Sequence, residues 1–487
     1  MILESSFEGK EIVPLWVDGR PLSHDINRLI EVYSSISGEL ISLAHSANVT
    51  EAIQAAESSW KSFQEWRNAT AFTRRDLLQR VADIYEKRID ELTRYQMEET
   101  SCSEVFARFN VRYAQQALRE TASRISSISG SVPQMESKDA WALVLREPIG
   151  PVLAIPPWNS SIILATRSVM TPIAAGCSVV FKASELCPRA HFAITEAFYE
   201  AGLPAGVLNQ IQANRNDAAA VTEALISSWA IRKIEFIGSS TVGRFIGKSA
   251  AEHLKPVLME LGGKSPAIIL EDASISRAAA MCAEGAFLHH GQICFSTERV
   301  IVLRTIAEQF KEALAAYVQE HHQKAGHAIT VTGAKHACEL LVDAHANGAK
   351  FLVGGPEMVG PASVRPTIVT NVTKECRIWD EETFGPSATL YIVDTEDEAV
   401  ELANCSSFGL TAAIHTNNLP RALKLAKRLE YGQVHINSIT EFEEVTAPVG
   451  GVKGSGWGRN NAHWGLDEFL VDKMVSIHGE NSEATFG

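Results

Sequence analysis

The sequence predicts an α/β protein with two domains built on parallel sheets. Between residues 151 and 272, short apolar segments alternate with helical ones, which is the pattern of buried parallel strands joined by helical crossovers. A second series of the same kind runs from residue 266 to about 457. The chain has 487 residues, which at roughly 150 residues per domain allows about three domains.

The first elements along the chain are predicted to be helical. From about residue 50 to 128, apolar residues recur at three- and four-residue spacings, which predicts a run of helices. The pattern changes to alternation at 141–150, which predicts an extended strand.

The first α/β series follows this strand. Its predicted strands are 152–155, 178–182, 207–211 and 234–238. Its predicted helices run to about 174 and lie near 190–201, 216–228 and 241–252. Such an order of elements is typical of nucleotide-binding domains.

The second series has predicted strands at 267–270, 299–303, 388–393, 410–416 and 433–437. One helix is predicted through Gly285 and His289, and a longer one near 306–322. The last segment, 469–478, is predicted to be a strand that pairs either with the 141–150 strand or with another subunit.

Composition argues against several classes of function. The net charge of −14 disfavours nucleic acid and membrane surfaces as partners, because an acidic surface repels phosphate groups. The sequence has no run of about 18 apolar residues that would predict a membrane span. The first residues resemble no export or transit signal and the last five resemble no retention tail, so we expect a cytoplasmic protein.

The cysteines predict a reduced chain. There are eight of them, and none forms a C-x-x-C pair, so neither a disulfide framework nor a zinc ribbon is expected. The histidine-containing segment 320–327 lacks zinc-ligand spacing and is interpreted as a solvated helix end. We therefore expect no metal site.

Cys294, in the segment GQICFST, is a candidate nucleophile. A thiol reacts strongly only when it is partly ionised, which requires positive potential or helix dipoles nearby. The alternative is a buried structural cysteine, and the local sequence alone favours that alternative.

Glu260, in MELGGKSP, is a candidate general base and lies 34 residues before the cysteine. It follows an apolar run and precedes two glycines, which permit close backbone approach or positive φ. A carboxylate at such a strand end can accept a proton during catalysis. The alternative is a solvated glutamate at the end of a strand.

Asn159, in IPPWNSS, directly follows the predicted strand 152–155, at the end where open α/β sheets bind ligands. Its amide can donate a hydrogen bond to a developing oxyanion. Ser160 or Ser161 can cap the next helix. The alternative is a rigid Pro-Pro turn in which the asparagine is only a turn residue.

Further motifs at strand ends indicate a nucleotide site. Lys182 and Glu185, in FKASELCP, either bind ribose hydroxyls or form a surface charge pair. The segment GSSTVG, 238–243, puts glycine and hydroxyl groups at a helix N-terminus, which suits a pyrophosphate, although the G-x-G-x-x-G pattern is absent. EETFGP contains Glu382 and Phe384, and PVGGVKGSGWGR is rich in glycine.

Together these motifs keep one order and one spacing, and the chain resembles the NAD(P)-dependent aldehyde dehydrogenase superfamily from about residue 15 to 475. The most specific pieces are E-L-G-G-K-S-P, G-Q-x-C at its characteristic separation, and E-E-x-F-G-P. F-K-A-S-E-L-C-P, G-Q-I-C-F-S-T-E-R and G-G-V-K-G-S-G-W-G-R are most similar to the salicylaldehyde and vanillin dehydrogenase branch.

The resemblance implies a domain organisation. It comprises a Rossmann-type cofactor-binding domain, a catalytic α/β domain and a small β bridging or oligomerisation element. The expected ranges are 1–128 with 150–260 for the first, 261–458 for the second, and 129–149 with 459–487 for the third. It also implies a homodimer or homotetramer formed through the 130–149 segment and the C-terminal strand.

The resemblance further implies a chemistry. Cys294 would attack the aldehyde carbonyl, the Asn159 side chain and the Cys294 backbone N–H would hold the oxyanion, and hydride would leave to the nicotinamide. Glu260 would activate water to hydrolyse the acyl thioester. The expected substrate is an aromatic or bulky apolar aldehyde. Alternatives are a semialdehyde or aliphatic substrate, a cofactor-free thiol hydrolase using His289 or His290, and a catalytically silent structural homologue.

The cofactor is expected to be NAD, with NADP not excluded. By resemblance, Lys182 and Glu185 contact the adenosine ribose, Ser239 the pyrophosphate and Glu382 the nicotinamide ribose, and Phe384 packs near the ring. The full set of expected cofactor-binding residues is Ile155, Pro156, Pro157, Trp158, Lys182, Ser184, Glu185, Gly238, Ser239, Ser240, Thr241, Val242, Gly243, Leu261, Glu382 and Phe384.

Some residues depart from the family pattern. Ser160 and Ser161 replace a Phe-Pro pair, which opens or polarises the substrate tunnel. Arg215 stands where a 2′-phosphate of NADP would be reached. Phe442, Glu443 and Glu444 near the tunnel mouth differ from the branch named above.

Arg167 lies about two helical turns after Asn159. It either faces the substrate tunnel, where it would favour a phenolate or carboxylate substituent, or forms a structural ion pair.

Overall fold

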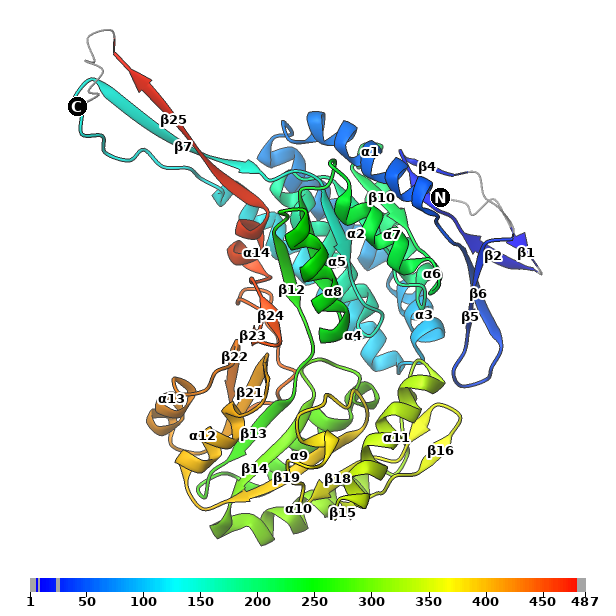
Figure 1. Cartoon of the computed structure of the whole chain (residues 1–487), viewed down its shortest axis with the longest axis vertical. Coiled ribbons are helices and arrows are strands. Elements are labelled where there is room, and N and C mark those ends of the chain that lie inside the picture. Colours follow the sequence, from blue (N-terminus) through cyan, green and yellow to red (C-terminus); the bar gives the residue numbers. More distant parts are fainter. Residues whose placement is uncertain (1–5, 8, 23–26, 480–487) are drawn as a thin grey trace.

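The computed structural model of the protein describes residues 6–7, 9–22 and 27–479. Two α/β lobes lie one above the other, and a two-stranded arm projects from the upper lobe (Figure 1). The C-terminal tail on which the retention prediction rests is outside the described residues, as is part of the N-terminal segment considered for export.

The upper lobe, called the first lobe, is built on an eight-stranded sheet of order β24-β12-β11-β8-β9-β10-β3-β4. Its central strands are parallel: β8 (Val152–Ile155), β9 (Val179–Lys182), β10 (Leu208–Ile211), β11 (Lys233–Ile237) and β12 (Val257–Glu260). Its antiparallel edge strands are β3 (Trp16–Val17), β4 (Arg20–Pro21) and β24 (Gly456–Trp457). Because β11 lies beside β8, the strand order reverses between these two strands, and open α/β sheets bind ligands at such a point.

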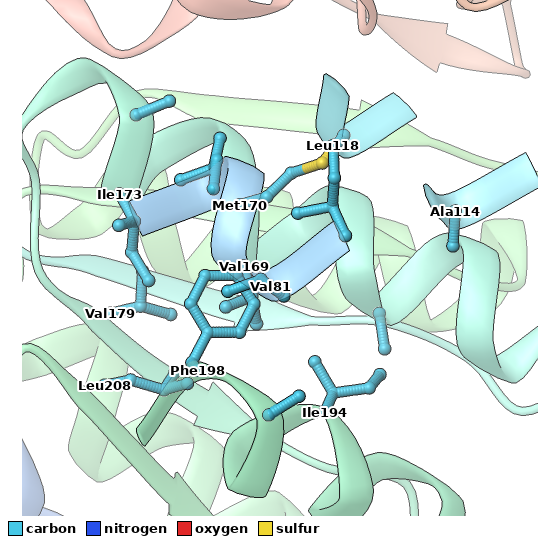
Figure 2. Close-up of a cluster of buried hydrophobic side chains, with 14 of the residues drawn as sticks. Val81, Ala114, Leu118, Val169, Met170, Ile173, Val179, Ile194, Phe198 and Leu208 are labelled. Carbon is cyan, nitrogen blue, oxygen red and sulfur yellow. The ribbon is translucent and has the colours of Figure 1, made fainter. Parts of the chain in front are cut away.

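Helices of the first lobe pack around this sheet. They are α1 (Val49–Trp66), α2 (Ala71–Lys87), α3 (Ile89–Thr100), α4 (Glu104–Arg124), α5 (Ser161–Ala175), α6 (Pro188–Glu200), α7 (Ala218–Ser227) and α8 (Ser240–Glu252). Figure 2 shows part of the core, where Val81 of α2, Leu118 of α4 and Phe198 of α6 surround side chains of α5.

Helix α5 lies at the centre of this core, and every one of its residues is buried. A polar side chain on such a helix needs a partner, because burial without one is costly. The Thr166 and Tyr85 hydroxyls are 2.7 Å apart, and the Ser168 hydroxyl donates to Glu235 over 3.1 Å. Arg167, between them, also needs partners, and these lie in the site described below.

The second lobe has a seven-stranded sheet of order β15-β18-β19-β14-β13-β21-β22. Its strands are β13 (Ser265–Ile269), β14 (Thr297–Leu303), β15 (Lys350–Val353), β18 (Thr367–Thr370), β19 (Ser387–Val393), β21 (Thr411–His415) and β22 (Gln433–Ile436). Its helices are α9 (Ile275–Phe287), α10 (Ala307–His321), α11 (Val331–Ala346), α12 (Glu396–Asn404) and α13 (Leu419–Ala426). Strand β15 is antiparallel to its neighbour, and the other pairs are parallel.

The projecting arm consists of β7 (Ala140–Pro148) and β25 (Leu470–His478), which pair antiparallel over their whole length (Figure 1). Helix α14 (Ala462–Glu468) leads into β25. A separate N-terminal sheet joins β1 (Ser6–Phe7), β2 (Lys10–Val13), β5 (Leu29–Tyr33) and β6 (Leu40–His45). Two short ribbons pair β16 (Met358–Gly360) with β17 (Ser363–Val364) and β20 (Phe408–Gly409) with β23 (Val452–Lys453).

Apart from the end of α9, the predicted strands and helices of both α/β series are confirmed, with ends that differ by two residues or fewer. The C-terminal strand pairs with the 141–150 segment of its own chain, which was one of its two predicted partners. Helices α11, α12 and α13 and strands β15 and β18 were not predicted, and the apolar period of α11 is diluted by small residues. Within the described residues, none of the helices is both long and apolar enough to cross a membrane.

One predicted helix is too long. Helix α9 ends at Phe287, whereas the sequence predicted that it would continue through His289. His289 and His290 have φ of 48° and 58°, and Gly291 has φ of 70°, so three consecutive residues are left-handed. A right-handed helix cannot continue through that conformation, and the reversal directs the chain toward Cys294.

Candidate active site

Two cavities meet at the boundary between the lobes. The large cavity has a volume of about 770 Å³, within the size range of cofactor sites, and the other, called the narrow cavity, is smaller. The two cavities share four lining residues, which are Asn159, Leu164, Glu260 and Cys294. The three predicted catalytic residues therefore lie at the junction of the two cavities.

The sheet of the first lobe positions two of these side chains. Glu260 is the last residue of β12, beside Ile237 at the end of β11. Asn159 follows β8, the other neighbour of β11. Both residues therefore lie at the carboxyl ends of the two parallel strands that flank β11, next to the point where the strand order reverses.

Cys294 comes from the second lobe, in the segment between α9 and β14. Two glycines after Glu260 allow this segment to approach. A Cβ atom on Gly263 would lie 2.3 Å from the Cys294 carbonyl oxygen, and one on Gly262 would lie 2.2 Å from a carboxylate oxygen of Glu382. Close packing against backbone thus requires glycine at 263, and at 262 a side chain would displace the Glu382 carboxylate.

The Cys294 thiol is half-buried, and its Sγ lies 3.9 Å from Oε1 of Glu260. Burial, together with the nearby carboxylates of Glu260 and Glu382, raises the pKa of this thiol well above its ordinary value. The thiol is consequently protonated at neutral pH without ligands, and Glu260 is in position to receive its proton.

Asn159 is buried, and its Nδ2 donates to the backbone carbonyl of Gln292 over 2.9 Å. The Gln292 side chain in turn donates to the carbonyls of His289 and His327 and accepts from the N–H of Ile329. An asparagine amide has two N–H groups, so this arrangement leaves one free for an oxyanion.

Glu260 uses its two carboxylate oxygens differently. Oε2 accepts from Arg167 over 2.7 Å and from Asn460 over 3.4 Å, while Oε1 faces the thiol. Burial raises the pKa of Glu260, and the charge of Arg167 opposes that rise. Arg167 also pairs with Glu443 over 2.9 Å, so the structure contains the ion pair that was one of the two readings of this arginine.

The large cavity contains nine of the sixteen expected cofactor-binding residues. They are Pro157, Trp158, Gly238, Ser239, Ser240, Thr241, Leu261, Glu382 and Phe384. The described residues that line it do not include Ile155, Pro156, Lys182, Ser184, Glu185, Val242 or Gly243. Lys182 and Glu185 instead lie at the end of β9, and Glu185 lines a different cavity.

The N-terminus of α8 opens onto the large cavity. Ser239 caps this helix by accepting from the N–H of Val242 over 3.4 Å. Arg244, which was not among the predicted cofactor-binding residues, also lines the cavity. A helix N-terminus beside an arginine suits the pyrophosphate of a dinucleotide.

Trp158 and Phe384 line the same cavity, and their rings are in T-shaped contact at 5.7 Å between centroids. Glu382 is beside them and accepts from the N–H of Gly263 over 2.8 Å. Burial and the nearby carboxylate of Glu298 raise the pKa of Glu382 to about 8.

Lys264 and Glu298 form a buried ion pair that holds the loop carrying Glu382. Lys264 also donates to the carbonyl of Glu381 over 2.8 Å, and Glu298 accepts from the N–H groups of Thr383 and Phe384. Both charged residues belong to motifs noted in the sequence, but only the tertiary structure reveals that they pair.

The glycine-rich segment 448–459 borders the site. Gly456 in β24 pairs with Glu260, and a Cβ on it would lie 2.1 Å from the Met259 carbonyl oxygen. Its neighbour Ser455 donates to the carbonyl of Gly262 over 2.7 Å. This segment therefore supports the strand that carries Glu260.

Aromatic side chains form much of the wall of the narrow cavity. Three of them, Phe106, Phe109 and Tyr113, lie on one face of α4. A fourth, Phe295, directly follows Cys294 in the chain. The residues that complete the lining are Asn110, Ser160, Ile163, Leu288, Ile293, Glu441 and Glu443. The spacing of the three α4 residues was visible in the sequence, but it is also the spacing of an ordinary core face.

Besides Glu260, two further glutamates, Glu441 and Glu443, line the narrow cavity, and the described residues that line it include no lysine, arginine or histidine. Burial raises the pKa of Glu441 well above its ordinary value, which favours the neutral form of this side chain.

The two histidines before Cys294 have other partners. The His289 ring stacks on Phe106 with 4.6 Å between centroids, and Nε2 of His290 accepts from the N–H of Val364. Burial lowers the pKa of His289 to about 4 and that of His290 to about 3. Among the described residues, no group of three or more histidine, cysteine or acidic side chains has a geometry that could hold a metal ion.

The sequence matches the Aldehyde dehydrogenase family over residues 22–475. It is 38% identical over 474 residues to a salicylaldehyde dehydrogenase from Pseudomonas sp. (strain C18), covering 95% of this chain and 96% of that protein. It is also 38% identical over 473 residues to a vanillin dehydrogenase from Pseudomonas sp. (strain HR199 / DSM 7063), covering 96% and 98%.

Solved structures give the same result. A salicylaldehyde dehydrogenase from Pseudomonas putida G7, complexed with salicylaldehyde, matches with a TM-score of 0.94 at 36% identity, covering 98% of this chain and 100% of that chain. A point mutant of betaine aldehyde dehydrogenase from Staphylococcus aureus, in complex with NAD+, matches with a TM-score of 0.93 at 27% identity, covering 98% and 99%. The predicted fold class and the likeness to the salicylaldehyde and vanillin dehydrogenases are confirmed. The chain therefore belongs to the aldehyde dehydrogenase family.

Proposed function

We propose that this protein oxidises aromatic or other bulky apolar aldehydes to carboxylic acids, with NAD+ or NADP+ as cofactor. The observation that carries the proposal is the convergence of Cys294, Asn159 and Glu260 at the junction of two cavities. One cavity would hold the cofactor and the other the aldehyde.

In the first half of the reaction, the sulfur of Cys294 bonds to the aldehyde carbon and the thiol proton passes to Glu260. The free N–H of Asn159 and the backbone N–H of Cys294 stabilise the resulting oxyanion. When bound, the dinucleotide supplies the acceptor for the hydride that leaves the substrate carbon. This loss of hydride leaves an acyl thioester on Cys294.

Between the two halves Glu260 releases the thiol proton to solvent. In the second half the ionised carboxylate removes a proton from water, and the hydroxide attacks the thioester carbon. The carbon–sulfur bond breaks, the carboxylic acid is released and the thiolate is regenerated. Oε1 of Glu260 serves both halves, because this oxygen faces Cys294 while Oε2 is held by Arg167.

The residues of the large cavity fit a dinucleotide. Ser239 and Arg244 at the start of α8 would hold its pyrophosphate, and Glu382 would bind the nicotinamide ribose, with Trp158 and Phe384 beside the ring. By the family resemblance, Glu185 just after β9 would meet the adenosine ribose and favour NAD, whereas the exposed Arg215 after β10 keeps NADP open.

The lining of the narrow cavity favours an uncharged aromatic aldehyde over a carboxylate-bearing semialdehyde. Phe106, Phe109 and Tyr113 offer flat apolar surfaces to a ring. The Glu443 carboxylate would repel a second carboxylate on the substrate. The nearby guanidinium of Arg167 already pairs with two carboxylates, so it is not free to bind a third.

The test is a substrate panel with both cofactors, followed by the absorbance of the reduced nicotinamide. We expect kcat/KM to be highest for salicylaldehyde- and benzaldehyde-type compounds and low for succinate semialdehyde and short aliphatic aldehydes. Cys294→Ala should abolish turnover, while Cys405→Ala, which removes an exposed cysteine, should not.

Each rival function has its own outcome. A preference for a short aliphatic aldehyde or a semialdehyde would overturn the aromatic assignment. Ester hydrolysis with no reduced cofactor from any aldehyde would favour a thiol hydrolase. Absence of turnover with every substrate and both cofactors would favour a catalytically silent homologue.

We further propose a homodimer or homotetramer assembled through the β7–β25 arm. A two-stranded sheet is marginally stable alone, and this one exposes apolar side chains, namely Trp141, Leu145, Val471, Met474 and Ile477. Light scattering coupled to size exclusion should give a mass of two or four chains, and a monomer would contradict the proposal. A cytoplasmic location stays a prediction, supported by eight unpaired cysteines.

A further inference from the structure

Arg167 occupies an unusual place for a charged residue. It lies in the middle of the fully buried helix α5 and is itself only 2% exposed. Its two terminal nitrogens bind two different carboxylates, Glu260 over 2.7 Å and Glu443 over 2.9 Å. Burying a charge is costly unless it is paired, so the arginine depends on both partners.

The pairing leaves the two oxygens of Glu260 with different surroundings. Oε2 is held by Arg167 and Asn460, and Oε1 is 3.9 Å from the sulfur of Cys294. A guanidinium holds a carboxylate in a planar, directional contact, which restricts rotation of the whole group.

We propose that Arg167 is a positioning residue for Glu260: it fixes one carboxylate oxygen so that the other points at the reacting sulfur, and Glu443 shares the same guanidinium. This inference rests on the proposed function, in which Glu260 activates water. Arg167 itself lines neither cavity.

The cluster contains one cation for two close carboxylates. Arg167 favours the ionised form of Glu260, and Glu443 disfavours it. A carboxylate that is paired alone with an arginine has a low pKa and is a weak base, whereas a buried carboxylate with no cation nearby has a high pKa and stays protonated. Because Glu443 shares the guanidinium of Arg167, the pKa of Glu260 is kept between these two extremes.

Other groups that face the cluster come from separate elements. Glu235 of β11 lies near Arg167, and burial raises its pKa to about 7. Tyr113 of α4 lies near both Arg167 and Glu443. Cys294 faces Glu260 from the second lobe, and Asn461 donates to Glu443 over 3.0 Å. Among these, Arg167 is the positive charge that opposes the rise in the pKa of Glu260.

The test uses the full-length protein without cofactor and p-nitrophenyl acetate as the probe. The Cys294 sulfur bonds to the ester carbonyl and p-nitrophenolate leaves, which gives a burst of colour. Water activated by Glu260 then cleaves the acetyl thioester, and acetate leaves. The burst measures acylation, and the slower steady rate, followed against pH, measures the step that needs ionised Glu260.

The acid limb is the pH range in which the steady rate falls as Glu260 becomes protonated. Arg167→Met should move this limb to higher pH by about 1–3 units, because the ionised form of Glu260 loses its stabilising charge. Arg167→Lys should move it less, because it retains the charge but not the two-armed contact. Glu443→Gln should move it in the opposite direction, to lower pH, and lower the plateau. Arg189→Met removes another buried, ion-paired arginine of the first lobe and should not move the limb.

The outcomes separate this inference from the proposed function. A normal burst with an acid limb that neither Arg167 variant moves would overturn the role of Arg167 and leave the proposed function intact. If Glu260→Gln neither slows the steady rate nor removes the limb, the proposed function itself fails. Should Arg167→Met not fold, the shifts in Arg167→Lys and Glu443→Gln decide, and equal or absent shifts in these two would overturn the inference.

Discussion

Gly263 packs directly against the backbone of Cys294: a β-carbon on the glycine would lie 2.3 Å from the cysteine's carbonyl oxygen. This contact joins the two lobes, because Gly263 follows β12 of the first lobe and Cys294 belongs to the second. Glu260, three residues before the glycine, is brought next to the thiol by the same contact. The position of the nucleophile relative to its base therefore depends on the absence of a side chain.

Gly263→Ala should consequently impair catalysis more than folding. The added methyl group must push the Cys294 segment away, and a displacement of about 1 Å can cost roughly 10²-fold in rate. We expect kcat/KM to fall by about that factor and the melting temperature to fall by a few degrees. Gly355→Ala is the control, because a β-carbon there meets nothing within 4 Å. If the Gly263 variant retained full activity, the contact would not control the geometry of the site.

Asn159→Ala should lower kcat much more than it raises KM. The side chain would act on the oxyanion that forms during the reaction, and removing one such donor costs about 10²–10³ in kcat. Asn159 also holds the Gln292 carbonyl, so Asn159→Asp, which keeps the size but not the amide donor, should be similarly impaired. Steady-state kinetics measure both effects, and a change confined to KM would argue against an oxyanion role.

The sequence predicted those site residues that lie at the ends of regular strands. Buried parallel strands are continuous apolar runs, so their ends were visible, and the parallel strands put Asn159 and Glu260 at one edge of the sheet. Two further motifs, the glycines after Glu260 and the Gly-Gln-Ile-Cys segment, indicated the part of the site that the second lobe contributes. The resemblance to a known family turned these separate patterns into one site.

Other features depend on packing between distant segments, which sequence patterns do not encode. The aromatic face of α4 looked like an ordinary core face until the fold put Phe109 and Tyr113 on the narrow cavity. The partners of Arg167 lie 93 and 276 residues away, so neither spacing nor composition indicated them. The cofactor contacts expected of Lys182 and Glu185 stay a prediction, because these residues lie at and just after the end of β9, outside the lining of the large cavity.

Glu382 gives the cofactor-free protein a pH-dependent stability. Its pKa is raised to about 8, whereas an unfolded glutamate has a pKa of about 4.3, so the folded state binds the extra proton between these values. Stability therefore falls as pH rises through that window. Glu382→Gln removes this contribution, and the loss of melting temperature between pH 6 and pH 9 should shrink by about 2 °C or more.

The comparison of melting temperatures needs one control. Glu57→Gln replaces an exposed glutamate of α1 and should melt with the same pH dependence as the unaltered protein. Glu99 and Glu235, whose pKa values burial raises to about 7, affect all three proteins equally. An unchanged pH dependence in Glu382→Gln would mean that Glu382 is already ionised in the folded state.

Phe109→Ala should change substrate preference without unfolding the protein. The ring lines the narrow cavity, yet it is 54% exposed, so its removal leaves little of the core unfilled. A lost aromatic contact is worth about 0.5–1.5 kcal/mol, which corresponds to roughly a 2- to 13-fold rise in KM for benzaldehyde-type substrates. Short aliphatic aldehydes do not reach the ring and should keep their KM. Phe72→Ala, which removes a similarly exposed ring on α2 that lines neither cavity, serves as the control and should alter neither value. An equal rise in KM for both substrate classes would show that the α4 face acts on the stability of the site and does not select for aromatic rings.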